Sequence, residues 1–234
     1  MPDPRQRKAG EVIDDAEADA RVRKTDRAPL QTGSVSVSVK TPQAASRFSI
    51  WTARTVAATL GVMAVTALSL YTMGRGLWCS GGGLSPWSWD IWTQHNSQHL
   101  LDPYSFTHMQ HGVLAYALLW WVLRTRWPEA RFVTAILIEA GWEVTENTNF
   151  VIDSYRESTI ALNYYGDSVL NSVADIVAFS LGYTAAAGLS AWASAVAFLE
   201  VEAVLLLAIR DSLSLNIVML LHPIEAIKTW QAGG

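Results

Sequence analysis

Residues 176–209 read IVAFSLGYTAAAGLSAWASAVAFLEVEAVLLLAI, and this stretch decides the fold. As one helix it would be about 50 Å long, at about 1.5 Å per residue. The hydrocarbon core of a bilayer is only about 30 Å thick, so the stretch is too long to cross once. Gly188-Leu-Ser190 therefore predicts a tight hairpin turn between two membrane spans, at 167–189 and 190–209.

Three more apolar segments precede this hairpin and predict spans at 50–73, 108–127 and 131–151. Arg54 near the start of the first span can extend its charged end to the interface. The second is the least apolar, because only 112–123 lacks polar residues. The predicted fold is all-α: a polytopic transmembrane helix bundle of about five spans.

The C-terminal segment 211–231 has a different pattern. Its apolar run 215–221 is too short to span, and Pro223 interrupts it. Apolar side chains then recur at helical spacing. We expect an amphipathic helix that is interfacial or re-entrant, with a sixth span as the alternative.

The N-terminal segment 1–47 is polar, whereas the chain as a whole is 50% hydrophobic and 16% charged. It holds nine of the 17 Lys and Arg and almost no large apolar residue. Such a segment cannot bury enough surface to offset the entropy of ordering, so we predict a disordered tail. Residues 48–234 would form the transmembrane domain.

The distribution of Lys and Arg predicts the orientation. The tail is basic, and Arg124, Arg126 and Arg131 surround the turn after the second span. In a five-span protein these two regions face the same side, which should be the cytoplasm. The tail is therefore predicted to be cytoplasmic, and the loop 74–107, rich in Gly, Ser, Pro and Trp, to face outward.

Composition and motifs exclude several classes of protein. The net charge of −4 is small and says nothing about a nucleic-acid partner, but no basic stripe or base-stacking motif is present, so we expect none. Cys79 is the only cysteine, which excludes an intrachain disulfide and metal clusters held by cysteines. Trp78 before it argues against a lipidation site. No P-loop, dinucleotide fingerprint or Ser-His-Asp order is present.

Ionisable residues gather in the outward half of the predicted bundle. Glu139, Glu143 and Glu146 recur at i, i+4 and i+7, on one face of a helix. Two further sets occur at comparable depth: His108 with His111, and Asp167 with Asn171 and Asp175. A charge at a helix centre costs about 2.5–3.5 kcal/mol on insertion scales. Each residue alone could be a hydrogen-bonded packing residue, but the set predicts one polar, outward-opening cavity.

The residue types suggest roles in this cavity. We assign catalytic roles to Glu143, Asp175 and Glu146, and metal binding to His108 and His111. Such a site suits a divalent ion such as Zn²⁺, Mn²⁺, Mg²⁺ or Ca²⁺. The residues predicted to bind substrate at the rim are Arg156, Arg210, Asp167, Asn171 and Tyr155.

Several segments resemble an uncharacterised family of bacterial inner-membrane proteins of unknown function. They are SQHLLDPYSFTH at 97–108, WEVTEN at 142–147, YGDSVLNS at 165–172 and IRDSLSLN at 209–216. The resemblance covers about residues 50–231 and implies a multi-pass protein of the bacterial inner membrane, with no established activity.

A weaker similarity, of pattern only, extends to VanZ-like membrane proteins, which are linked to glycopeptide resistance. It implies that the functional residues are His108 or His111, Glu143, Glu146, Asp167, Asn171 and Asp175. It does not imply what they do.

Two classes of function follow, and the sequence does not decide whether the protein is an enzyme. In the first, the cavity binds or processes a lipid headgroup or cell-envelope precursor, with membrane lipids as partners. In the second, the protein is a non-catalytic membrane component. It would then be a proton or ion pathway, or an assembly partner in a larger complex.

Overall fold

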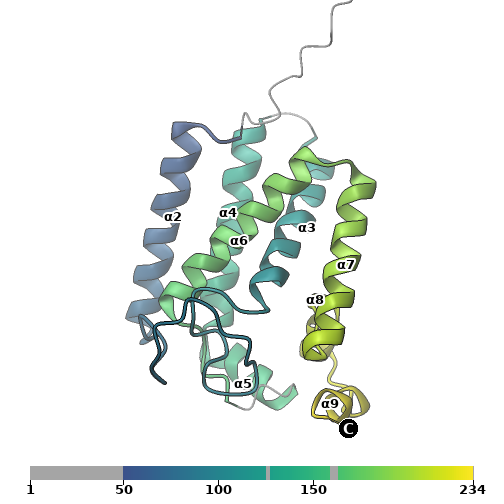
Figure 1. Cartoon of the computed structure of the whole chain (residues 1–234). Helices are drawn as coiled ribbons and strands as arrows, with labels where there is room; N and C mark the ends of the chain where they lie inside the picture. The colour runs from purple at the N-terminus through teal and green to yellow at the C-terminus, as the bar shows by residue number, and fades with distance from the viewer. Residues whose placement is uncertain (1–49, 125–126, 159–162, 234) are drawn as a thin grey trace, which may run out of the picture. The chain divides into compact units, whose positions relative to one another are not determined.

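A computed structural model describes residues 50–124, 127–158 and 163–233, and within these ranges it is helical (Figure 1). The described residues form no strand, only one isolated bridge between Trp87 and Leu101. The predicted tail 1–47 lies outside the described residues. The helices are α2 Ala53–Thr72, α3 Ser105–Leu123, α4 Pro128–Glu146, α5 Asn149–Ser158, α6 Val169–Gly188, α7 Ala191–Ile209, α8 Leu213–Leu221 and α9 Glu225–Gln231.

The predicted hairpin turn is confirmed. Helix α6 ends at Gly188 and α7 begins at Ala191. The Ser190 side chain caps α7 by accepting a hydrogen bond from the Ala193 backbone N–H at 3.2 Å. The apolar stretch is thus divided where the sequence predicted.

Three of the described helices, α2, α6 and α7, are long and apolar enough to cross a membrane. This indicates a membrane protein, but the predicted count of about five spans is not confirmed. Helices α3 and α4 fall outside that set because they carry the polar residues of the cluster: α3 begins with a polar turn, and α4 contains three glutamates after residue 138.

The region of the predicted third span is divided between two helices. It was expected to run over 131–151, but α4 ends at Glu146 and a new helix, α5, begins at Asn149. Asn147 ends α4, where its side chain donates a hydrogen bond to the Asp167 carboxylate at 2.8 Å. The chain turns at this contact, and α5 follows directly after the turn.

Helices α3 and α6 pack more closely than any other pair. A Cβ on Gly112 of α3 would come within 2.1 Å of the Phe179 carbonyl oxygen on α6. Only glycine permits this approach. An apolar core then joins α3, α4 and α6 through Leu119, Phe132 and Tyr183, all buried.

The short helices and the long connection between α2 and α3 gather at one end of the bundle (Figure 1). Figure 1 shows α5, α9 and the connection between α2 and α3 beyond the lower ends of the long helices. Helices α8 and α9 have nine and seven residues, too few to cross a bilayer. The polar residues predicted to form a cavity lie on the turns of α3, α4 and α6 nearest this end.

Candidate functional site

The start of α3 positions the first histidine of the cluster. Asp102 Oδ1 accepts hydrogen bonds from the backbone N–H groups of Tyr104 and Ser105, at 2.7 and 3.1 Å. In return, the Asp102 backbone N–H donates to the Ser105 hydroxyl at 3.2 Å. This reciprocal pair turns the chain into the helix, and His108 follows one turn later.

His108 lies among three carboxylates. Its Nδ1 is 2.6 Å from Glu139 Oε1 and 3.3 Å from Glu143 Oε1, both on α4. Its Nε2 is 3.9 Å from Asp175 Oδ2 on α6. His111 Nδ1 approaches the other oxygen of Glu139, at 3.6 Å. Three helices therefore bring the predicted groups together around one imidazole.

Several polar atoms in this cluster are buried without a hydrogen-bond partner among the described residues. They are both carboxylate oxygens of Glu143, Oδ1 of Asp175 and both amide atoms of Asn171. A buried polar atom without a hydrogen-bond partner reduces the stability of the fold by about 1–3 kcal/mol, and a charged atom reduces it by more. His108, Glu143 and Glu146 can each direct one ligand atom to a common point, and so can His108, His111 and Glu139. The donor set fits a divalent cation.

A second polar network fixes Asp167 at the start of α6. Its carboxylate accepts hydrogen bonds from Asn147 Nδ2 at 2.8 Å and from the Tyr164 hydroxyl at 3.0 Å. Its backbone N–H donates to Asn147 Oδ1 at 2.7 Å. Burial and the charge of Asp167 raise the pKa of Tyr164, so the phenol keeps the proton that it donates.

The cluster borders a cavity of about 210 Å³. Its lining includes polar side chains: His108, His111, Glu146, Asp167 and Asp175. Helix α8 contributes aliphatic side chains to the same lining, through Leu213, Ile217 and Leu220. The cavity is therefore amphiphilic, with both titratable and aliphatic groups in its lining.

The predicted site residues differ in where they lie relative to the cavity. Asp167, Tyr155 and Asp175 line the cavity, while Asn171 and Glu143 are buried behind its wall. The two arginines predicted at the rim do not line it. Arg156 lies over the Tyr165 ring at 4.8 Å and 3.8 Å from Asp153 Oδ1. Arg210 is exposed and donates to the Trp230 carbonyl oxygen at 3.0 Å.

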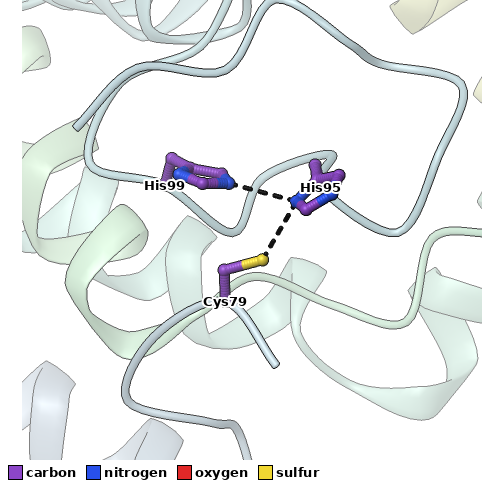
Figure 2. A group of neighbouring side chains, drawn as sticks. All are labelled: Cys79, His95 and His99. Atoms are coloured by element: carbon purple, nitrogen blue, oxygen red, sulfur yellow. Dashed lines mark hydrogen bonds between the residues drawn. The ribbon is translucent and has the colours of Figure 1, made fainter. Parts of the chain in front are cut away.

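Some candidate residues were missed by sequence reasoning. Asn147 was seen only as a polar helix end, and the contribution of α8 depends on tertiary packing. Cys79, His95 and His99 form a further group in the loop before α3 (Figure 2). The spacing His95-x₃-His99 was the available signal, but a lone cysteine was considered only as a disulfide, lipid or cysteine-cluster residue.

Comparisons with known proteins agree with the resemblance found in the sequence. Residues 70–233 match a family described as protein of unknown function (DUF2585). The chain is 44% identical over 178 residues to the UPF0314 protein of Paracoccus denitrificans, covering 75% of this chain and 91% of the relative. The UPF0314 protein of Brucella anthropi is 43% identical, covering 74% and 88%. No solved structure matches.

Proposed function

We infer that this chain, which belongs to the DUF2585 family of proteins of unknown function, binds a membrane amphiphile in its cavity. The observation that carries the inference is the mixed lining of the cavity. A histidine–carboxylate cluster and the aliphatic side chains of α8 both contribute to it. A lipid or lipid-linked cell-envelope precursor likewise combines a polar headgroup with an apolar chain.

The charge of the cavity specifies how a headgroup would bind. Among the described residues that line it, the charged side chains are Glu146, Asp167 and Asp175, with no lysine or arginine. An anionic headgroup would be repelled unless a cation lay between. A divalent ion at His108, Glu143 and Glu146 would neutralise the carboxylates and bind phosphate oxygens.

His108 would then hold the ion in a fixed position. Its two ring nitrogens face carboxylates on different helices, Glu139 on α4 and Asp175 on α6. A group held on both sides in this way keeps a fixed ring orientation, as a metal ligand requires. We propose that the protein processes the headgroup as well as binding it, with Glu146 and Asp175, which both line the cavity, beside the reacting group and Glu143 behind them as a ligand of the ion.

The apolar core favours this function over the alternative of a proton or ion pathway. The cluster ends at Glu139, and one turn further along α4 the core consists of Ile136, Ala135 and Phe132, all fully buried. A pathway would need polar groups to continue toward the other end of the bundle. A cavity closed by an apolar core suits a ligand that enters and leaves on one side.

The proposal includes a location. We place the protein in the bacterial inner membrane with its N-terminus in the cytoplasm and the cavity open to the outer leaflet. The Lys and Arg distribution supports this orientation. The similarity to VanZ-like proteins, which rests on residue pattern alone, stays a prediction.

The test is lipid mass spectrometry and elemental analysis of the detergent-purified protein. Wild type should retain one enriched amphiphile and a divalent metal. Ile217→Trp should lose the amphiphile, because the ring would fill the cavity. The matched control is Leu207→Trp on α7, where the side chain is 87% exposed and distant from the cavity lining. Equal amphiphile content in all three proteins would refute the proposal.

Two substitutions of Glu143 separate a functional role from a structural one. Glu143→Gln keeps the shape and removes the charge, so it should yield folded protein with reduced metal content. Glu143→Leu removes the polar group altogether. If Glu143 only packs, Glu143→Gln should keep wild-type metal and amphiphile content, and Glu143→Leu should be the harmful change.

A further inference from the structure

We propose that Cys79, His95 and His99 bind a transition metal ion of the Zn²⁺ type, at a site separate from the His108 cluster. Figure 2 shows the three side chains converging in the loop before α3. Cys79 Sγ lies 3.2 Å from His95 Nδ1, and the same Nδ1 lies 3.2 Å from His99 Nε2. Cys79 and His99 are 6% and 4% exposed.

The separations match those between ligands of one ion. Zinc lies about 2.3 Å from sulfur and about 2.0–2.1 Å from nitrogen, so tetrahedral angles separate the ligand atoms by about 3.3–3.6 Å. The contacts of His95 Nδ1 are close to this range. Hydrogen bonding alone does not account for both, because a single proton on Nδ1 can be directed at Sγ or at Nε2, not at both.

The second nitrogen of His99 has the partner that metal-binding histidines usually have. His99 Nδ1 lies 2.7 Å from the Ser85 carbonyl oxygen and must donate to it. The proton is therefore on Nδ1, and the Nε2 lone pair faces the group. A backbone carbonyl in this position fixes the tautomer and ring orientation of a metal ligand. Trp78 packs against the same ring, with centroids 5.5 Å apart.

The backbone on both sides of the group is attached to the start of α6. Gly76 and Leu77 accept hydrogen bonds from the backbone N–H groups of Val169 and Leu170, at 2.8 and 3.3 Å. On the other side, the Ser97 carbonyl oxygen accepts from the Ser168 N–H at 3.0 Å. The cysteine and the histidines are thus held by one helix end, which preorganises the three ligands.

Gly81 contributes space beside the group. A Cβ there would lie 2.9 Å from Gln94 Nε2 and 3.1 Å from His95 Cε1, so any side chain would displace the imidazole. Among the described residues, three supply ligand atoms, which leaves one tetrahedral position for water. The thiolate makes the site softer than the carboxylate cluster and selects zinc-like ions over Mg²⁺ or Ca²⁺.

The experiment uses the full chain in detergent, with the affinity tag removed and metals stripped by a chelator. Co²⁺, as a spectroscopic substitute for Zn²⁺, should give a thiolate-to-metal charge-transfer band, and Zn²⁺ should abolish it. Cys79→Ser should eliminate the band. It should also weaken Zn²⁺ binding at this site by at least about 100-fold, since loss of an outer-shell partner alone costs about 10–100-fold.

Matched variants distinguish metal binding at this site from metal binding at the His108 cluster. His95→Gln and His99→Gln should weaken Zn²⁺ binding as Cys79→Ser does, whereas His222→Gln, at an exposed histidine, should not. Glu143→Gln should retain the thiolate band, so failure of the proposed function would leave this result unchanged. If wild type gives no thiolate band and Cys79→Ser binds Zn²⁺ as tightly as wild type, the site does not exist. Circular dichroism of each variant checks that it is folded.

Discussion

Gly182 of α6 lies so close to Met109 of α3 that a Cβ on the glycine would come within 1.9 Å of the Met109 carbonyl oxygen. Met109 directly follows His108, and Gly182 lies two helical turns after Asp175. The approach of the two backbones therefore sets the distance between the histidine and the aspartate of the cluster.

We predict that Gly182→Ala destabilises the protein by about 1–3 kcal/mol, because the methyl group forces two packed backbones apart. The change should also lower the metal content of the cluster by displacing His108. Unfolding in detergent, followed by circular dichroism, measures the first effect.

Gly141→Ala is the matched control, since Gly141 is in α4 and nothing lies within 4 Å of its Cβ position. Alanine is favoured over glycine within a helix by about 1 kcal/mol, so this variant should be as stable as wild type or more stable. Equal stability of the two alanine variants would contradict the close packing of α3 and α6.

Asn147→Ala should reduce the free energy of unfolding by about 2–4 kcal/mol, because it removes the hydrogen bonds that the Asn147 amide makes with Oδ2 and with the backbone N–H of the buried Asp167. Asn149→Ala, at an exposed position two residues later, should have little effect. Thermal unfolding of both variants tests this. A loss of stability in Asn149→Ala alone would contradict the role assigned to Asn147.

Asp102 should make stability depend on pH. Burial and the charge of Asp167 raise its pKa from 3.8 to about 6, while the charge of His108 acts in the opposite direction. A raised pKa means that the folded state binds the proton more tightly. The resulting stabilisation is fully present below about pH 3.8 and is lost as the pH rises through about 6, in total about 3 kcal/mol.

Asp102→Asn is the test of this pH dependence. The amide keeps the oxygen that accepts from Tyr104 and Ser105, and it carries no charge. The variant should therefore resemble wild type near pH 4, exceed it in stability at pH 7, and show a flatter profile between. An unchanged slope between pH 4 and 7 would assign the pH dependence to other groups.

Reporter fusions test the orientation. A fusion after Ser85 should be active as a periplasmic reporter, and one after Leu123 should not. The reverse result would place the cavity on the cytoplasmic side and change the membrane leaflet from which an amphiphile enters.

The sequence predicted what depends on length and periodicity. The run from Ile176 to Ile209 was too long for one crossing, so its division followed from bilayer thickness alone. The spacing of Glu139 and Glu143 placed them on one face of a helix before any partner was known. These properties are local, and the structure brings both glutamates to His108.

Properties that depend on tertiary contacts were not predictable from one sequence. Asn147 ends α4 because it meets Asp167, twenty residues later, and nothing in the local pattern indicates this. Arg156 and Arg210 were placed at the rim by their charge, yet they interact with neighbours outside the cavity. In the sequence, Gly112 and Gly182 do not differ from other small residues. The need for glycine comes only from the close packing of α3 against α6.

Asn96 and Ser97 line the cavity and stand between His95 and His99 in the chain. If both proposed sites bind their ligands, one short segment belongs to two binding equilibria, and a change in its conformation at one site would link the two. If an ion in the loop alters the affinity of the cavity for its ligand tenfold, the ligand must alter the affinity for the ion by the same factor, about 1.4 kcal/mol. The affinity of the protein for each ligand would then depend on the concentration of the other ligand.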